Sequence, residues 1–278
     1  MSTAAELLRA SGLPPLEARI LLMHVLGWRR TELITRDHEA LDADCVARFE
    51  ALAARRTAGE PIAQLTGKRE FFGLDFAVTP DVLIPRPETE LLVELTLDAI
   101  AGTPGARVLD LGTGTGAIAV SIAHARPDAR VWAVDRSPAA LDVARGNAQT
   151  LLAPERTGGP ITLVESDWTA NIDPSLRFEA IVSNPPYIAS DDPHLDQGDL
   201  RFEPRGALTD DADGLSAIRA IIETAPFLLA SGGALWIEHG YDQSDAVRRL
   251  LAARGFSDVR SMRDLAGIER CSGGRFTA

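Results

Sequence analysis

Alternating strand-like and helix-like segments after residue 88 constrain the fold of this 278-residue chain more than any other feature. Short apolar runs predict strands over 107–111, 130–135, 161–165, 179–183 and 234–238, and near 258–262 and 275–277. Amphipathic patterns predict helices over 117–125, 138–150, 214–229 and 243–254. This alternation predicts an α/β fold with a mostly parallel, doubly wound sheet, whose ligand site lies at the carboxyl ends of the strands.

The part of the chain before this alternation has a different pattern. From Thr3 to Thr57, apolar residues recur at steps of three and four, and Pro14 and Pro15 stand where a helix would begin. A small helical-bundle domain is therefore expected over residues 1–67. Two β-prone runs flank Gly73 and predict a β-hairpin within a linker at 68–83. The α/β domain then occupies residues 84–278.

A glycine-rich segment closes the first strand of the predicted sheet and opens a helix. Glycines let the backbone turn tightly and approach a ligand, and the helix N-terminus offers free N–H groups. Asp135 ends the next strand, where its carboxylate can accept hydrogen bonds from ribose hydroxyls. A strand, a glycine loop, a helix and a distal acid in this order indicate a nucleotide site. The residues expected to bind the cofactor in this segment are Asp110, Gly112, Thr113, Gly114, Thr115 and Gly116.

The identity of the nucleotide stays open on the glycines alone, since 112–117 also satisfies the spacing of a dinucleotide-binding loop. Asp110 favours S-adenosylmethionine, because a carboxylate directly before the glycines can pair with an ammonium or sulfonium group and would repel a pyrophosphate. Asp167 and Trp168 follow the third strand and offer an acid and an aromatic face for the adenine. Trp168 is also compatible with a simple packing role.

Four residues after the fourth strand, Asn184, Pro185, Pro186 and Tyr187, form the expected catalytic loop. The prolines fix their φ angles and present carbonyls without N–H groups, so the loop is rigid and rich in acceptors. Asn184 adds a side-chain carbonyl, and Tyr187 adds a flat face with a hydroxyl. Such a loop suits a planar substrate with an NH₂ group, because two acceptors can hold both hydrogens and aim the nitrogen at a methyl group. We expect Asn184, Pro185 and Tyr187 to be catalytic.

Charge and cysteine content narrow the class of partner. The formal net charge is −12, and residues 1–70 hold ten basic and ten acidic side chains, so the rest of the chain carries all of it. An acidic body repels phosphate backbones, which argues against nucleic acid as a substrate. No run resembles a membrane span or a secretory signal, and Cys45 and Cys271 have neither disulfide nor metal spacing. A cytoplasmic monomer without a membrane, nucleic-acid or metal partner is expected.

Taken together, these motifs resemble the protein-(glutamine-N5) methyltransferase family that modifies peptide chain release factors. The resemblance extends over nearly the whole chain. Besides the two loops, it includes PIAQLTG from Pro61, FFG from Phe71, LIPRPETE from Leu83, Glu203-Pro204, Asp213-Gly214-Leu215, and Glu238-His239-Gly240 followed by Gln243.

The resemblance implies a seven-stranded, Rossmann-like class I methyltransferase domain, preceded by a helical domain that docks the protein substrate and by the hairpin linker. It also implies that S-adenosylmethionine is the methyl donor, that S-adenosylhomocysteine is the product, and that the glutamine of a Gly-Gly-Gln motif in release factors is methylated. Cofactor contacts then fall on Gly112–Gly116, Asp135, Trp168 and Asn184. Contacts with the glutamine fall on all four residues of the catalytic loop.

Four further residues have weaker signals. Arg86 and Glu88 either border the cofactor pocket or form a structural ion pair. Glu203 either faces the substrate channel or caps nearby backbone. His239 is interpreted as a structural histidine near the end of a strand.

Three alternative functions remain at this point. A glutamine methyltransferase that acts on a ribosomal protein would share both loops. An adenine-N6 DNA methyltransferase would present the same planar NH₂ group to the catalytic loop, but it would need a basic groove and a recognition region that this acidic chain lacks. A non-catalytic cofactor-binding protein would not need an intact loop at 184–187.

Overall fold

The computed structural model describes residues 2–277, and these divide into two compact units. The first unit holds the described residues up to Lys68 together with Asp196–Phe202. The second holds Arg69–Leu195 and the described residues from Glu203 onward. The predicted end of the helical domain at residue 67 lies beside this division, whereas the assignment of Asp196–Phe202 to the first unit is not apparent from the sequence.

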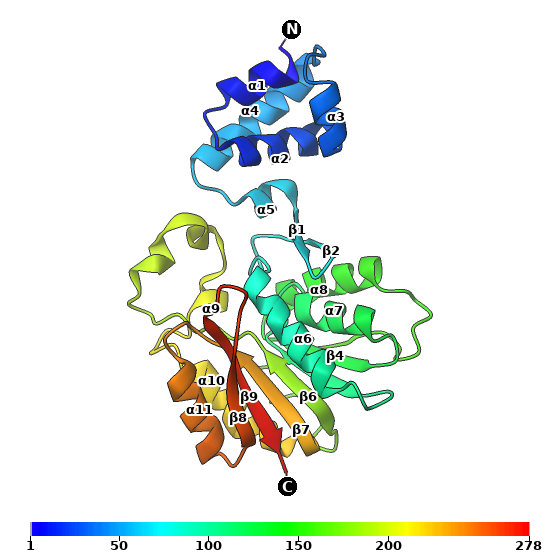
Figure 1. Cartoon of the computed structure of the whole chain (residues 1–278), viewed down its shortest axis with the longest axis vertical. Coiled ribbons are helices and arrows are strands. Elements are labelled where there is room, and N and C mark those ends of the chain that lie inside the picture. The colour runs from blue at the N-terminus through cyan, green and yellow to red at the C-terminus, as the bar shows by residue number, and fades with distance from the viewer. Residues whose placement is uncertain (1, 278) are drawn as a thin grey trace. The chain divides into compact units, whose positions relative to one another are not determined.

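Short helices build the first unit (Figure 1). They are α1 (Ala4–Ala10), α2 (Pro15–Leu26), α3 (Arg30–Thr35), α4 (Ala43–Thr57) and α5 (Ile62–Thr66), with the 3₁₀ turn η3 (Gly198–Phe202) from the later segment. The side chains of Thr3 and Asp42 cap α1 and α4 by accepting hydrogen bonds from backbone N–H groups. Leu21, Leu22 and Phe49 are buried in the core that these helices share. The predicted helical bundle is therefore present.

The segment Asp196–Phe202 is held in the first unit by polar contacts. Nη1 of Arg56 lies 2.9 Å from the carboxylate of Asp199, and the same guanidinium pairs with Glu17 at 2.7 Å. Nε2 of Gln64 donates to the backbone carbonyl of Phe202 at 3.0 Å. Because these partners are far apart in sequence, their pairing could not be read from local patterns.

A β-hairpin follows the helical unit, as predicted. Its strands are β1 (Lys68–Phe71) and β2 (Leu74–Ala77). Phe72 and Gly73 have φ angles of 51° and 77°, which suit the tight two-residue turn that joins antiparallel strands. The rings of Phe71 and Phe76 meet edge to face, with centroids 6.0 Å apart, and both are buried in the core of the second unit.

A seven-stranded sheet forms the centre of the second unit, in the order β5-β4-β3-β6-β7-β9-β8. All neighbouring strands are parallel except that β9 runs antiparallel to β7 and β8. The strands are β3 (Arg107–Leu111), β4 (Arg130–Asp135), β5 (Thr162–Glu165), β6 (Phe178–Ser183), β7 (Leu229–Glu238), β8 (Ser257–Arg263) and β9 (Glu269–Phe276). The predicted α/β class with a mostly parallel sheet is confirmed.

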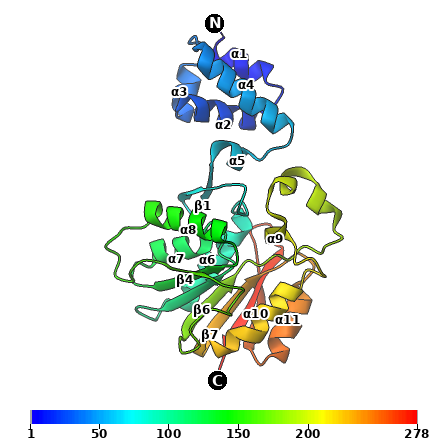
Figure 2. The same cartoon turned by 180° about the vertical axis from the view of Figure 1, so that it is seen from behind.

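Helices cover both faces of this sheet (Figures 1 and 2). The helices α6 (Glu90–Ala99), α7 (Ala117–Ala125) and α8 (Pro138–Leu151) pack on one face, and α10 (Ser216–Thr224) and α11 (Ser244–Ala253) pack on the other. Alternation along β3 divides its side chains between the two cores, with Val108 on the α6 and α7 side and Leu109 on the α10 and α11 side. Shorter elements are η1 (Pro87–Thr89), η2 (Pro193–Asp196), α9 (Arg205–Leu208) and η4 (Ala225–Phe227).

Three predicted boundaries were wrong, including the start of β7, which lies at Leu229 rather than at Ala234. The helix expected over 214–229 ends at Thr224, because Pro226 lacks the N–H group that a continuing helix would use, and β7 already begins at Leu229. The last strand begins at Glu269 rather than near residue 275. Its Cys-Ser-Gly-Gly run has a low strand propensity, yet a side chain at Gly273 would come within 2.3 Å of the Trp236 ring and the Leu235 carbonyl oxygen.

The strand register brings four chain segments together at the carboxyl edge of the sheet. Leu111 at the end of β3 is paired with Val134 of β4 and with Ser183 of β6. Ser183 is paired in turn with Ile237 of β7. The residues that follow these positions therefore leave the sheet side by side, at the point between β3 and β6 where the strand order reverses. None of the helices within residues 2–277 has the length and apolar character needed to cross a membrane.

Candidate active site

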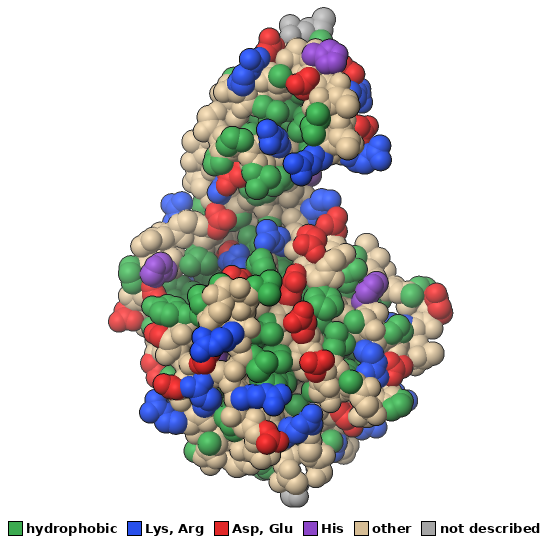
Figure 3. Space-filling view, viewed as in Figure 1, with side chains coloured by type: hydrophobic (Ala, Val, Ile, Leu, Met, Phe, Trp, Pro, Cys, Tyr) green, Lys and Arg blue, Asp and Glu red, His purple; other side chains and the backbone are tan. Residues whose placement is uncertain are grey.

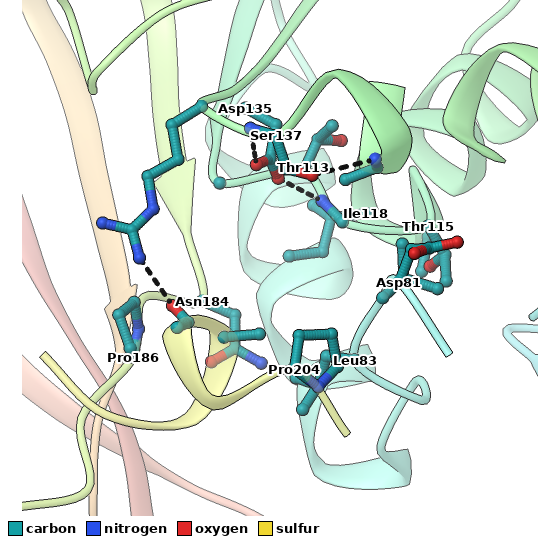
Figure 4. A pocket seen from close by; sticks show the side chains of 18 of the residues that line it. Asp81, Leu83, Thr113, Thr115, Ile118, Asp135, Ser137, Asn184, Pro186 and Pro204 are labelled. Carbon is teal, nitrogen blue, oxygen red and sulfur yellow. Dashed lines mark hydrogen bonds between the residues drawn. The ribbon is translucent and has the colours of Figure 1, made fainter. Parts of the chain in front are cut away.

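A cavity of about 240 Å³ opens at this edge of the second unit (Figure 4). Figure 4 shows Asp135, Asn184 and Pro204 around it, on three different segments. The predicted site residues that line it are Gly112, Thr113, Gly114, Thr115, Asp135, Asp167, Trp168, Asn184 and Pro186. The predicted site residues outside the lining are Asp110, Gly116, Pro185 and Tyr187.

The glycine loop is shaped by backbone hydrogen bonds to the neighbouring strand. The N–H groups of Gly112 and Thr113 both donate to the carbonyl of Val134, at 2.9 and 2.8 Å. Gly112 has a φ angle of 72°, and a Cβ atom there would lie 3.5 Å from the ring of Trp168. A side chain at this position would thus strain the backbone and fill the space between the loop and the indole.

Asp110 supports the loop from behind and does not line the cavity. Its side chain is fully buried, and Oδ2 accepts a hydrogen bond from the Thr113 hydroxyl at 2.7 Å. Burial raises the pKa of Asp110 to about 7, against the hydrogen bonds from Thr113 and from the N–H of Ala119, which lower it. The expected pairing of this carboxylate with a cofactor cation therefore does not fit the geometry, because alternation along β3 turns Asp110 beneath the start of α7.

Asp135 lines the cavity and also holds the loops beside it. Its Oδ2 accepts from the N–H of Gly114 and its Oδ1 from the N–H of Ser137, both at 2.9 Å. Each carboxylate oxygen has a second lone pair, so both remain acceptors for a ligand. The carbonyl of the same residue accepts the N–H of Ser166 at 3.0 Å, which brings Asp167 and Trp168 to the cavity.

Trp168 adopts a backbone conformation that is rare for a bulky residue. Its φ angle is 48°, in the left-handed region. Backbone strain of this kind clusters at active sites and ligand sites, where the surrounding structure holds the strained residue in place. Here the turn places the indole over Gly112, where it forms one wall of the cavity.

The loop at 184–187 has Asn184 and Pro186 at the cavity and the Tyr187 side chain turned inward. Asn184 lines the cavity, and its Nδ2 group donates to the hydroxyl of Thr89 at 3.1 Å, so its Oδ1 is left as an acceptor. Tyr187 donates its hydroxyl to Oε1 of Glu238 at 3.2 Å. Burial, with the nearby charge of Glu238, raises the pKa of Tyr187 well above its usual value, so the phenol stays protonated.

The backbone of Tyr187 is held by two residues from later segments. Its carbonyl accepts a hydrogen bond from Nε2 of Gln243 at 3.0 Å. Gly214 has a φ angle of 75°, and a Cβ atom there would lie 2.3 Å from the same carbonyl oxygen. Only glycine allows both the turn and this close approach, which gives a structural reason for the Asp213-Gly214-Leu215 motif.

Arg86 lines the cavity and is paired with Glu203 rather than with Glu88. The Glu203 side chain is fully buried and accepts hydrogen bonds from the Arg86 guanidinium and, at 2.9 Å, from the N–H of Ile84. This carboxylate therefore joins the segment before α6 to the one that follows η3. Of its two interpretations, the contacts favour the cap on nearby backbone.

His239 is buried and satisfied within the protein, which fits its structural interpretation. Its Nδ1 lies 2.8 Å from the carbonyl of Gly240 and its Nε2 lies 2.7 Å from the hydroxyl of Ser272. Burial lowers the pKa of His239, so the ring is neutral. Sequence reasoning missed two residues around the catalytic loop, Thr89 and Glu238, although both lie in motifs that carried the resemblance.

Comparison with known proteins gives the chain a family. Residues 1–67 match the family model "PrmC N-terminal domain", and residues 87–198 match "Methyltransferase small domain". A protein named release factor glutamine methyltransferase from Burkholderia pseudomallei is 70% identical over 99% of this chain and 96% of its own length. The protein of that name from Escherichia coli is 45% identical over 98% of this chain and 96% of its own length.

A solved structure extends the comparison to the fold. A methyltransferase from Pyrococcus furiosus is 19% identical and superposes with a TM-score of 0.53, covering 81% of this chain and 98% of that one. At this identity the likeness concerns the fold alone. The high identity to full-length relatives is the decisive finding, and it shows that the chain belongs to the release factor glutamine methyltransferase family.

Proposed function

We propose that the protein transfers a methyl group from S-adenosylmethionine to the side-chain amide nitrogen, N5, of a glutamine in peptide chain release factors, the glutamine of the Gly-Gly-Gln motif. Two names of full-length relatives support this substrate. The observation that carries the proposal is the hydrogen bonding of the Asn184 side-chain amide. Its Nδ2 group is engaged by Thr89, so Oδ1 is available to accept a hydrogen bond from a substrate amide at the cavity.

The residues that line the cavity fit S-adenosylmethionine. Asp135 offers carboxylate acceptors for ribose hydroxyls, and Trp168 offers an aromatic face for adenine. Asp135 would suit the ribose of NAD as well, and it is the match to a methyltransferase family model that disfavours the NAD alternative. When bound, S-adenosylmethionine supplies an electrophilic methyl group and leaves as the neutral thioether S-adenosylhomocysteine.

The protein's own contribution to the reaction is orientation. A carboxamide nitrogen is a weak nucleophile because its lone pair is delocalised into the carbonyl. Asn184 Oδ1 and a backbone carbonyl of the proline pair would accept the two N–H hydrogens and orient the nitrogen toward a bound methyl donor. As the nitrogen–carbon bond forms and the carbon–sulfur bond breaks, the nitrogen becomes strongly acidic and releases one proton to water. The reaction therefore requires no general base.

We also infer that the helical unit docks the release factor. Two large apolar side chains of this unit, Leu16 and Ile34, are 68% and 67% exposed. Figure 3 shows further hydrophobic side chains at its surface, between basic ones. The proposal includes a monomer, and a cytoplasmic location, since translation ends there. The acidic second part of the chain argues against nucleic acid as the substrate.

A labelling experiment tests the reaction and its substrate. The protein is incubated with S-adenosylmethionine that carries a radioactive methyl group, together with a release factor, ribosomal proteins and DNA. Label is expected on the release factor, and mass spectrometry is expected to place it on the Gly-Gly-Gln glutamine. A release factor with this glutamine changed to glutamate should bind without being methylated, because it offers no NH₂ group. Label on a ribosomal protein or on adenine would establish the corresponding alternative.

The same assay tests docking when intact release factor is compared with a short peptide that contains the glutamine. Docking on the helical unit predicts that changing Leu16 and Ile34 to Ser raises KM for the intact factor and leaves peptide methylation unchanged. Equal effects on both substrates would contradict the docking role.

Gly214→Ala is expected to slow methylation at least tenfold while S-adenosylmethionine still binds. The added Cβ would meet the Tyr187 carbonyl at 2.3 Å, so the catalytic loop must move, and a shift on the order of 1 Å at a reacting group is costly. Gly105→Ala is the matched control, because Gly105 has a φ angle of 65° with nothing within 4 Å of the added Cβ. If both variants lose the same activity, backbone strain rather than the contact with Tyr187 is the cause.

A further inference from the structure

The carboxyl group of Glu238 is buried beside the catalytic loop, and nothing in the proposed reaction uses it. Glu238 is the last residue of β7 and is 1% exposed. The pairing of Ser183 with Ile237 places it next to Asn184, one position beyond the paired strands. A buried carboxyl group costs free energy unless its hydrogen bonds repay the loss of water. The hydrogen bonds made by this carboxyl group must therefore offset the cost of its burial.

Two hydroxyl groups converge on this carboxyl group. Tyr187 donates to Oε1 at 3.2 Å. The hydroxyl of Thr89 is close enough to the same carboxyl group to lower its pKa. Thr89 is 5% exposed and stands at the start of α6, where its Oγ1 also accepts from Nδ2 of Asn184 at 3.1 Å. Glu238 thus holds Tyr187 directly and lies beside the Thr89 hydroxyl that holds Asn184.

The direction of these hydrogen bonds is fixed by the carboxylate. In its ionised form the carboxylate can only accept, so the hydroxyls of Thr89 and Tyr187 then direct their protons toward Glu238. With its proton committed, the oxygen of Thr89 can only accept, and the partner available to it is the NH₂ end of the Asn184 amide. That end is thereby held toward Thr89, and Oδ1 is held away from it. A chain of hydrogen bonds of this kind makes one amide orientation more stable than its flipped form.

The charged groups around Glu238 come from two elements, β9 and η1. Burial raises its pKa to about 7, while the hydroxyls of Thr89 and Tyr187 and the charge of Arg270 on β9 lower it. Glu88 in η1 raises it. Cys271 is paired with Glu238 across β7 and β9, and burial raises the pKa of its thiol well above the usual value.

One oxygen of this carboxyl group, Oε2, has no hydrogen-bond partner among the described residues. A core position selected for stability alone would be better filled by an apolar side chain, because an unpaired buried oxygen costs about 1–3 kcal/mol. The presence of a buried carboxylate at Glu238 is explained if it holds the side chains of the catalytic loop in position.

We propose that Glu238 and Thr89 are positioning residues for the methyl transfer: together they hold the Asn184 amide with Oδ1 directed to the substrate, and Glu238 also holds the Tyr187 ring. This inference rests on the proposed function, since it assigns Oδ1 to the glutamine amide. It separates two roles within the site, because Asn184 touches the substrate and the other two residues act through it.

The first test removes the hydroxyl of Thr89. Thr89→Val keeps the shape of the side chain. We expect kcat to fall by about tenfold, because the loss of one hydrogen bond has an effect of this size. The affinity for S-adenosylmethionine should change little. Thr89→Ser restores a hydroxyl and should recover most of the lost turnover. Thr96→Val is the matched control, because Thr96 is a buried threonine of α6 whose hydroxyl donates to the Leu92 carbonyl at 2.7 Å. It should lower the melting temperature and leave kcat unchanged.

The second test changes the carboxylate to an amide of the same shape. In Glu238→Gln the new NH₂ group must donate, so the Thr89 hydroxyl turns round and its proton competes for Oδ1 of Asn184. We expect kcat to fall by about tenfold here as well. In an Asn184→Ala background, Thr89→Val should not reduce kcat further, because it acts through Asn184, and the loss caused by Glu238→Gln should shrink to the part that comes from Tyr187. A loss from Thr89→Val that multiplies with that of Asn184→Ala would overturn the proposal.

A spectroscopic readout keeps this test independent of the substrate. In ¹⁵N-labelled protein, the Asn184 side-chain NH₂ should show one slowly exchanging proton, and Thr89→Val should abolish that protection. Wild-type exchange in Thr89→Val, or wild-type kcat, would show that Thr89 does not orient the amide. If the wild-type protein labels a substrate other than release factor, the proposed function fails, whereas the NMR result still decides the orientation of Asn184.

Discussion

Asn184→Ala is expected to lower the rate of release factor methylation by roughly a hundredfold or more, the range found when a group that orients or stabilises the reacting atoms is lost. The substitution removes Oδ1, the side-chain acceptor of the catalytic loop at the cavity. A glutamine amide held by backbone carbonyls alone can rotate, and its nitrogen then spends little time in line with the methyl group. Single-turnover kinetics with saturating S-adenosylmethionine measure this step directly.

Binding should separate this effect from a general loss of structure. Release factor affinity should change little, because docking is spread over a surface much larger than one side chain. Asn171→Ala is the control: Nδ2 of Asn171 donates to the Glu165 carbonyl at 2.8 Å, and the residue does not line the cavity. It should methylate at the wild-type rate. An Asn184→Ala protein that does the same would show that the catalytic loop has been misread.

The elements that sequence predicted best are those whose pattern is local and strong. The strand over 107–111 and the helix over 117–125 have the predicted bounds, because an apolar run and an amphipathic repeat on either side of a glycine loop leave few alternatives. The helix α6 was not predicted. Its acidic residues Glu90, Glu94 and Asp98 stand four positions apart and form a polar side opposite the buried one, so the sequence did contain a signal for this helix.

In the candidate site, too, the residues that belong to a local motif could be predicted, whereas contacts between residues far apart in the sequence could not. The residues that line the cavity on the glycine loop and at Asp135 could be named from their spacing alone. The side of the loop on which Asp110 lies could not, because it depends on which face of β3 meets α7. The pairing of Thr89 with Asn184 joins residues 95 positions apart, and only the packing of α6 against β6 brings them together.

Asp135→Ala is expected to weaken S-adenosylmethionine binding by about a hundredfold or more. Hydrogen bonds to a charged acceptor are worth about 1.5–3 kcal/mol each, and loss of two from the ribose amounts to at least ~3 kcal/mol. The effect is increased because Asp135 also accepts the N–H groups of Gly114 and Ser137, so its loss loosens both ends of the nucleotide site. Calorimetric titration gives the dissociation constant.

The fold should survive this change, since Asp135 stands at the end of β4 beside the cavity and not in either hydrophobic core. Asp142→Ala is the matched control, because Asp142 is a carboxylate of α8 that is 74% exposed and lies outside the cavity. It should bind S-adenosylmethionine as the wild type does. An unchanged dissociation constant for Asp135→Ala would exclude its carboxylate from ribose recognition. Tight binding of NADH by the wild-type protein, in place of S-adenosylmethionine, would overturn the assignment of the methyl donor and, with it, the reaction proposed for the catalytic loop.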